Sequence, residues 1–178
     1  MYRIVVIILK SLVIYFSRSG ENYVDGKIKN IDKGNTEIVA EKISEITGAS
    51  LFKVNPVKDY PFDYKECCKV ASFEFNNNKR PLIKEKIDIS GYDVIYIGGP
   101  IWCGHYPMCL FTALENIDFK GKIVKPFVTH EGSLFANTKE DIEYLCTGAI
   151  IKEGLAIVGS KSFSCDEIVE KWCEDVFR

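Results

Sequence analysis

The chain has 178 residues, of which 47% are hydrophobic and 27% are charged, a composition typical of a globular domain with one sizeable core. Its 23 basic and 25 acidic residues are scattered along the sequence, which argues against the clustered basic surface of a nucleic-acid-binding protein. No linker, charge block or internal repeat divides the chain. We therefore predict a single domain over residues 1–178, with its core in 11–178.

The apolar run near the amino terminus, residues 4–9, is far too short to span a bilayer. The residues after it do not resemble a signal-peptide cleavage site, so a cytoplasmic protein is expected. The 7 cysteines include no Cys-x-x-Cys pair, and we predict no metal site. Reduced, packed thiols fit best, while the adjacent Cys67 and Cys68 leave a strained redox bond as an alternative.

Strand and helix patterns alternate along the chain. Residues 11–16 form a continuous apolar and β-branched run, which predicts a strand buried on both faces. Residues 2–9 are also strand-like, and a helical stripe opens at Gly34-Asn35-Thr36 and ends at Thr47-Gly48. The later predicted elements are strands over 51–54, 93–100, 122–128 and 155–158 and helices over 63–75, 107–115, 139–146 and 166–176.

This alternation predicts an α/β fold, with a doubly wound, five-stranded parallel sheet and helices on both faces. In such sheets ligands bind beyond the carboxyl ends of the strands. The turns after Phe16, Gly99 and Val128 should therefore converge at one edge, and function is expected there.

The first of these turns begins Ser17-Arg18-Ser19-Gly20 and resumes at Gly34-Asn35-Thr36, directly ahead of a helix. Unpaired N–H groups and the positive end of the helix dipole would hold a phosphate there, and the hydroxyl groups add donors. The alternative is an ordinary helix N-cap by Asn35 or Thr36.

The second turn, residues 100–107, places Trp102 and Tyr106 where they should be exposed. A flat ring system would stack on Trp102 while loop N–H groups meet its polar edge. The alternative is a tryptophan that caps the core. The third turn, residues 129–133, brings His130 to the same edge, and His105 should reach that crevice too. Neither histidine has an evident partner for a nucleophilic triad.

Four pieces of the sequence together resemble the flavodoxin-like proteins: residues 15–20, residues 34–36, residues 99–102 and residues 129–133. The likeness runs from the first strand to the last helix. It implies the strand order 2-1-3-4-5 and a bound flavin mononucleotide (FMN). By this resemblance the phosphate is held by Ser17, Arg18, Ser19, Asn35 and Thr36, and the flavin ring is flanked by Pro100, Ile101, Trp102, Cys103, Gly104, Thr129, His130, Glu131, Gly132 and Ser133.

Two roles within that set also follow from the resemblance. Trp102 would be the stacking residue, and Glu131 is a candidate for disfavouring an anionic reduced ring, because charge near the flavin tunes its chemistry. Two features depart from ordinary flavodoxins. Residues 21–33 are inserted between the halves of the phosphate loop, from which Tyr23 could reach the flavin, and the chain is nearly neutral instead of strongly acidic.

The leading functional hypothesis is an electron carrier that works between redox partner proteins, as a monomer or weak homodimer. The alternative is an NAD(P)H-dependent quinone or flavin oxidoreductase of the same fold, in which His130 or Tyr106 would assist proton or hydride transfer. A hydrolase using Cys103 with His105 is disfavoured because the anion-binding loop has no cysteine. A response-regulator-like domain is disfavoured because Ser17, Gly99 and Thr129 stand where acidic residues would be needed.

Overall fold

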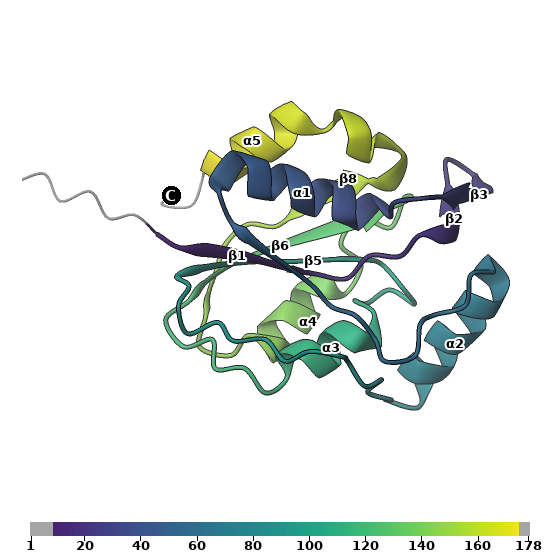
Figure 1. Ribbon diagram of the computed structural model, residues 1–178, viewed down its shortest axis with the longest axis horizontal. Helices are drawn as coiled ribbons and strands as arrows, with labels where there is room; N and C mark the ends of the chain where they lie inside the picture. Colours follow the sequence, from purple (N-terminus) through teal and green to yellow (C-terminus); the bar gives the residue numbers. More distant parts are fainter. Residues whose placement is uncertain (1–8, 175–178) are drawn as a thin grey trace, which may run out of the picture.

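The computed structural model describes residues 9–174 and has an α/β architecture, with a parallel sheet between helical layers (Figure 1). Five pairings, all parallel, build the sheet. Its six strands are β1 (Ser11–Tyr15), β4 (Ser50–Lys53), β5 (Val94–Pro100), β6 (Ile123–His130), β7 (Ile150–Ile151) and β8 (Leu155–Val158). The predicted fold class is confirmed.

The strand order is β4-β1-β5-β6-β7, and β8 also pairs with β6. The first four positions match the predicted order, but two short strands, β7 and β8, share the fifth position. The prediction of a single fifth strand is therefore wrong. The carbonyl groups of Lys122 and Val124 accept hydrogen bonds from this edge. The next residue of β6 that faces it is Pro126, which has no N–H to donate, and the ladder is interrupted there.

Helices cover both faces of the sheet. Figure 1 shows α1 (Asn35–Thr47) and α5 (Asp166–Glu174) on one face, and α3 (Met108–Leu114) and α4 (Thr138–Leu145) on the other. Each face has its own core cluster: Val39 and Val169 are fully buried on the α1 side, and Leu110 and Ile142 on the opposite side. The β-branched and aromatic strands are therefore buried between two apolar layers, as their sequence predicted.

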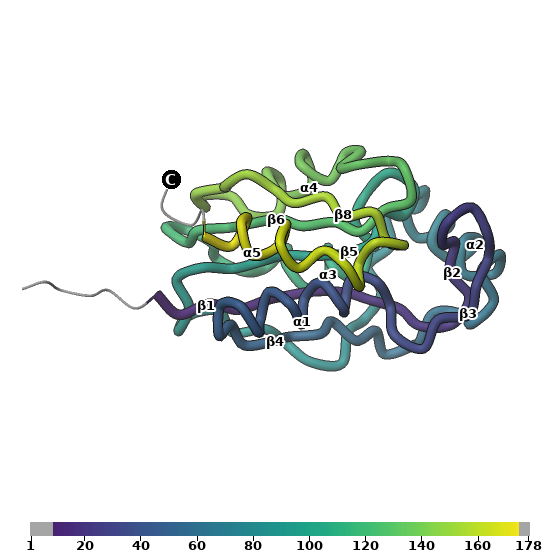
Figure 2. Tube along the Cα trace, turned by 90° about the horizontal axis from the view of Figure 1, so that it is seen from above, coloured from purple at the N-terminus to yellow at the C-terminus, as the bar shows by residue number. Residues whose placement is uncertain are grey.

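Two further elements lie at the end of the sheet where β1, β5 and β6 terminate (Figures 1 and 2). One is helix α2 (Tyr64–Asn76), and the other is an antiparallel hairpin of β2 (Gly20–Val24) and β3 (Lys27–Ile31). The hairpin turns at Asp25 and Gly26, both with positive φ, as a type I′ turn requires. The inserted segment is thus an ordered hairpin, for which no structure was predicted from the sequence.

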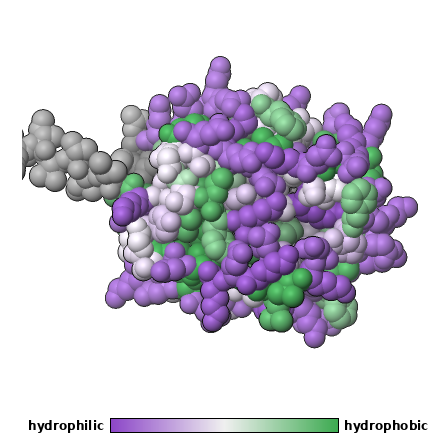
Figure 3. All heavy atoms as spheres, viewed as in Figure 1, coloured by the Kyte–Doolittle hydropathy of each residue, from purple (hydrophilic) through white to green (hydrophobic). Residues whose placement is uncertain are grey.

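The remaining elements agree with the sequence predictions to within a residue or two. A 3-10 helix, η1 (Gly159–Ser164), follows β8, and β7 was not predicted. The strand-like pattern of residues 2–8 and the last two positions of the predicted final helix lie outside the described residues. Within residues 9–174 no helix is long and apolar enough to cross a membrane. The face in Figure 3 is mostly hydrophilic, with small, separate hydrophobic patches.

Candidate functional site

A cleft of about 160 Å³ lies at the carboxyl edge of the sheet. Residues from all three predicted turns line it, together with residues of the hairpin, α2 and η1. The lining residues are Ser17, Arg18, Asn22, Tyr23, Asn35, Thr36, Tyr64, Pro100, Ile101, Trp102, Thr129, His130, Glu131 and Gly159. The predicted convergence of the three turns is therefore observed.

The amino terminus of α1 forms one wall of the cleft. Its N-cap is Gly34, which offers no side chain, so the alternative in which Asn35 or Thr36 is the N-cap is wrong. Ser17 acts in its place, because its buried Oγ accepts a hydrogen bond of 3.0 Å from the N–H of Glu37. A Cβ on Gly34 would lie 2.2 Å from Ser17 Oγ and 2.6 Å from the Arg18 carbonyl oxygen. Only glycine permits this close approach.

The side chains of the first two helical residues bridge this wall to neighbouring loops. Thr36 Oγ1 lies 2.7 Å from Thr129 Oγ1, and both residues are buried. Asn35 Oδ1 accepts a hydrogen bond of 3.2 Å from the Ser162 hydroxyl. The first N–H groups of a helix have no intrahelical partner, so the backbone of Asn35 and Thr36 offers donors at a positive helix end.

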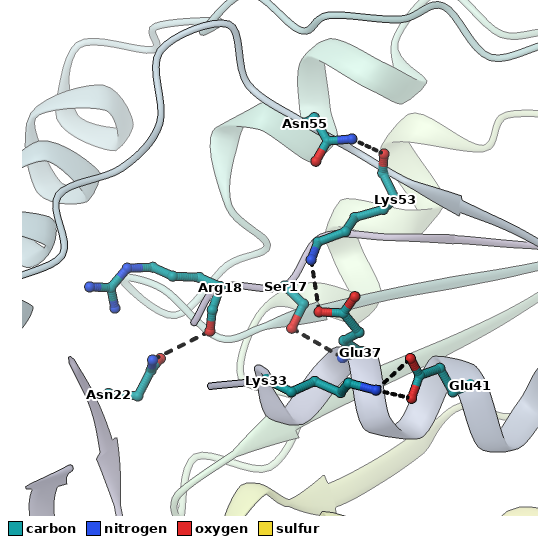
Figure 4. A network of polar contacts seen from close by, with 8 residues as sticks. All are labelled: Ser17, Arg18, Asn22, Lys33, Glu37, Glu41, Lys53 and Asn55. Carbon is teal, nitrogen blue, oxygen red and sulfur yellow. Dashed lines mark hydrogen bonds and ion pairs between the residues drawn. The ribbon is translucent and has the colours of Figure 1, made fainter. Parts of the chain in front are cut away.

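A network of charges stabilises the same wall from behind (Figure 4). Glu37 in the first turn of α1 accepts a hydrogen bond of 2.7 Å from Lys53 Nζ, and Lys33 Nζ lies 2.8 Å from both carboxylate oxygens of Glu41. Burial, followed by the Glu37 carboxylate, raises the pKa of the adjacent Tyr15 well above its usual value. Tyr15 therefore stays neutral, and its packing against α1 is preserved.

The Arg18 side chain points away from the α1 terminus (Figure 4). Its guanidinium group donates to the carbonyl oxygens of Pro61, Phe62 and Glu21, with the four contacts between 2.6 and 3.2 Å. Arg18 lines the cleft, but these hydrogen bonds join the hairpin to the segment before α2. Ser19 is exposed and lies outside the cleft lining. Their predicted contacts with a phosphate remain predictions.

Trp102 opens a second tight turn that lies beside the cleft. The backbone N–H of Trp102 donates to His105 and that of His105 donates to Trp102, at 2.8 and 2.9 Å. Cys103 and Gly104 between them both have positive φ, again the type I′ geometry. The half-buried indole ring stands edge-on to Phe16 and Tyr60, with centroids 5.3 and 4.8 Å away. Those two rings fix the indole at the cleft wall.

Cys103 and Gly104 do not line the cleft, and neither do Gly132 and Ser133. Cys103 is exposed on an adjoining cavity instead. The structure does not bring these four residues to the cleft surface with Trp102 and His130, so their predicted ring contacts stay predictions.

The two histidines have different environments. His105 lies outside the cleft lining: its Nδ1 is 2.8 Å from Asp141 Oδ1, and its ring stacks on Phe75 with centroids 4.6 Å apart. The expectation that both histidines meet in one crevice is therefore wrong, because the turn directs His105 toward α2 and α4. Tyr106 is fully buried and donates to the Phe127 carbonyl oxygen at 3.0 Å. His105 and Tyr106 therefore make contacts within the folded protein and not at the cleft surface.

His130 is buried and lines the cleft. Its Nδ1 accepts a hydrogen bond of 3.0 Å from the N–H of Gly132, so the ring proton of the neutral form sits on Nε2. Among the described residues this Nε2 is the one buried side-chain nitrogen or oxygen atom without a partner. Burial lowers the pKa of His130, with a smaller opposing effect from Glu131. A neutral imidazole with one free donor results.

Glu131 connects the cleft to two loops. One carboxylate oxygen accepts the N–H of Asp25 at the tip of the hairpin, at 3.0 Å, and the other accepts the N–H of Ser160 in η1, at 2.8 Å. The carboxylate is therefore held by backbone donors, and it fastens the hairpin over the end of the sheet.

Three lining residues were not predicted from the sequence: Asn22, Tyr64 and Gly159. Tyr64 begins α2, and its ring lies 6.4 Å from that of Tyr23 at an interplanar angle of 31°. An aromatic pair thus stands on the hairpin side of the cleft. The Asp25-Gly26 dipeptide could have signalled the hairpin, but no local pattern indicated that α2 would meet it. Within residues 9–174 no cluster of side chains suits a metal ion.

The family model described as flavodoxin matches residues 10–176. The chain belongs to the flavodoxin family. Solved structures agree with this assignment. A Bacteroides eggerthii protein designated a flavoprotein is 28% identical, with a TM-score of 0.74, over 94% of this chain and 98% of that one. No curated protein gives a significant match.

Two further solved structures resemble this flavodoxin-family chain. A Lactobacillus acidophilus flavoprotein, crystallised in complex with FMN, is 26% identical with a TM-score of 0.66, over 92% of this chain and 98% of that one. Oxidised flavodoxin 2 from Bacillus cereus is 20% identical with a TM-score of 0.56, over 94% and 97% of the two chains, and supports the fold alone.

Proposed function

We propose that this flavodoxin-family chain binds FMN in the cleft and transfers electrons between redox partner proteins. The observation that carries the proposal is the cleft itself. It combines the open amino terminus of α1, an indole ring at its wall and the unpartnered Nε2 of the buried His130. A buried donor without a partner is costly, so a polar ligand atom opposite it would remove that cost.

The phosphate of FMN would be held at the α1 terminus. Donors available there are the backbone N–H groups of Asn35 and Thr36, with the Ser17 hydroxyl group beside them. The close contact between Gly34 and the Ser17-Arg18 backbone shapes this pocket. A helix terminus suits a phosphate because its N–H groups and its dipole both favour negative charge.

The flavin ring would lie against Trp102 on one side, with Tyr23 and Tyr64 available on the hairpin side. FMN, when bound, supplies the acceptance and release of electrons. The protein positions the ring, excludes water from it and sets the charge around it. His130 Nε2 offers a hydrogen bond as a neutral donor. The Glu131 carboxylate, fixed by two N–H groups, adds negative charge at the cleft edge.

The first test is titration of FMN into the flavin-free protein, followed by its fluorescence and absorption. Stoichiometric binding supports the proposal, and a protein that takes up no FMN overturns it. Trp102→Ala should weaken binding by about 1 kcal/mol or more because a stacking partner is lost. Tyr144→Ala, at an exposed residue of α4 outside the cleft lining, is the matched control and should leave the affinity unchanged.

The second test separates a carrier from a reductase. The FMN-loaded protein is reduced anaerobically by dithionite, and in parallel by NADH and NADPH. Reduction by dithionite alone supports the carrier. Rapid reduction by a nicotinamide would overturn the carrier role in favour of the oxidoreductase. Analytical ultracentrifugation tests the accompanying proposal of a monomer or weak homodimer.

A further inference from the structure

Two exposed thiols line one cavity beside the cofactor cleft. Of the seven free cysteines, Cys68 and Cys103 are exposed and the other five are buried. Both line a second cavity of about 170 Å³. This cavity adjoins the cleft, and the two share the lining residues Arg18, Asn22, Tyr64, Ile101 and Trp102. The thiols therefore face solvent immediately next to the proposed flavin site.

The two thiols come from different elements that approach each other there. Cys103 Sγ lies 3.6 Å from the hydroxyl oxygen of Ser72 on α2. Ser72 is four residues after Cys68 on the same helix, so the Cβ atoms of these two residues are about 5–6 Å apart on one face. A disulfide needs Cβ atoms about 3.5–4.5 Å apart. Formation of the bond therefore requires α2 and the turn to approach each other across the open cavity that both thiols line.

Neither packing nor backbone conformation accounts for a cysteine at position 103. The residue is exposed and has a φ of 53° at the first central position of its turn. Glycine, asparagine and aspartate are the residues that suit this conformation, and a side chain held there costs free energy. The position of this thiol is therefore better explained by its chemistry than by the needs of the turn.

The buried cysteines are poor competitors. The thiolate is the reactive form of cysteine, and burial raises the pKa of Cys67 to about 11 and that of Cys146 to about 12. Cys67 also borders this cavity and is adjacent to Cys68 on α2, yet it is only 3% exposed. The vicinal bond considered from the sequence is thus disfavoured relative to a bond across the cavity.

We propose that Cys68 and Cys103 form a redox-active dithiol that exchanges with low-molecular-weight disulfides. The Cys103 thiolate attacks one sulfur of the small disulfide, forms a mixed disulfide and releases a first thiol. The Cys68 thiolate then attacks Cys103 Sγ, forms the intrachain bond and releases a second thiol. Two electrons pass from the protein to the small disulfide, and the two protein thiol protons end on the released thiols.

The intrachain bond would tie the turn that carries Trp102 to α2, whose first residue, Tyr64, lines the cleft. The redox state of the dithiol would therefore adjust one side of the flavin site. The exchange chemistry itself needs no flavin, so it can be tested on the flavin-free protein. Its failure would leave the FMN proposal untouched.

The full chain is reduced, freed of reductant and incubated with bis(2-hydroxyethyl) disulfide. Remaining thiols are then alkylated in denaturant and peptides are mapped by mass spectrometry. We expect two equivalents of released mercaptoethanol, loss of two of the seven protein thiols, and one cross-linked peptide pair joining Cys68 to Cys103. A cross-link between Cys67 and Cys68, a bond between two chains, or seven thiols still free would overturn the proposal.

Three variants sharpen the test. Cys68→Ala places a strong helix former at an exposed position, so this variant should fold. Its reaction should stop at the mixed disulfide on Cys103 and release one equivalent of thiol. Cys103→Asn suits the turn and should abolish the intrachain bond. Cys67→Ala is the matched control and should still form it. Loss of the bond in Cys67→Ala, with a melting curve like that of the wild type, would contradict the assignment.

Discussion

The two walls of the cleft are built in different ways. The inner wall, formed by Ser17, Gly34, Thr36 and Thr129, is largely buried, and two of its contacts join the loop after β1 and strand β6 to the first turn of α1. The outer wall, formed by the β2–β3 hairpin and the start of α2, is mostly exposed. Polar contacts from Arg18, Glu21 and Glu131 fasten it to the rest of the chain.

This difference implies that the inner wall contributes to the stability of the whole fold and the outer wall only to local order. Damage to the inner wall should affect the folding of the whole sheet, because its side chains are part of the core packing. Damage to the outer wall should instead loosen one segment, since exposed hairpins with few apolar contacts open locally. Substitutions in the inner wall should therefore lower the stability of the whole fold more than substitutions in the outer wall do.

The largest effect is expected for Gly34→Ala in the inner wall. The φ of −68° suits any residue, so the cost is steric: the new methyl group would meet Ser17 Oγ and the Arg18 backbone. We expect the free energy of unfolding to fall by about 2–3 kcal/mol, with loss of FMN binding, as measured by urea denaturation. Gly26→Ala in the hairpin turn has open space around it but a φ of +76°. It should cost about 1 kcal/mol locally.

The next largest effect is expected for Thr129→Val, also in the inner wall. This change removes one hydroxyl group of the 2.7 Å pair and leaves that of Thr36 buried with no partner from Thr129. Unfolding free energy should fall by about 1–3 kcal/mol. Thr147→Val provides a comparison at an exposed residue, because water can replace the hydrogen bond of 3.2 Å that this hydroxyl group donates to the Tyr144 carbonyl oxygen. An equal loss in both variants would contradict the special cost of the buried pair.

A smaller global effect is expected for Arg18→Gln in the outer wall. The change removes contacts to the carbonyl oxygens of Glu21, Pro61 and Phe62. Hydrogen exchange of the hairpin amides should accelerate strongly while that of β1 and β5 stays unchanged. Uniform acceleration across the sheet would instead place Arg18 among the residues that stabilise the whole fold.

Glu131→Gln should have a weaker effect of the same kind. Glu131 uses one oxygen for the N–H of Asp25 and the other for that of Ser160, whereas glutamine has one acceptor oxygen and would turn its NH2 group toward the second N–H. We expect faster exchange at these two amides and a loss of stability below about 1 kcal/mol. Glu143→Gln on the exposed face of α4 controls for the change in net charge.

The smallest effect is a pH dependence that comes from His130. Burial lowers its pKa in the folded protein, whereas in the unfolded chain it should titrate near about 6.5. As the pH falls through that value the unfolded chain gains a proton first, so the stability of the flavin-free protein declines and levels off below the folded pKa. His130→Asn should flatten this part of the curve of melting temperature against pH. An unchanged slope would show that other groups cause it.

The sequence alone determined the layers and the place of the site. Continuous apolar runs such as residues 11–16 and 93–100 require burial on both faces, and their alternation with helical stripes allows few topologies. The position of the site, at the carboxyl edge of the sheet, followed from that topology. These are local patterns, so they could be identified from neighbouring residues.

Only the tertiary structure decided which side chains face the cleft and what holds each of them. Arg18 finds its partners 43 and 44 residues away, and His105 finds Asp141 36 residues away. Across the adjoining cavity Cys103 contacts Ser72, which is 31 residues earlier in the chain. The fifth strand position is divided on either side of Pro126, because Ile123 and Val124 pair with β7 whereas Phe127 to His130 pair with β8. Long-range hydrogen bonds leave no periodic signal, because each depends on how distant segments pack together.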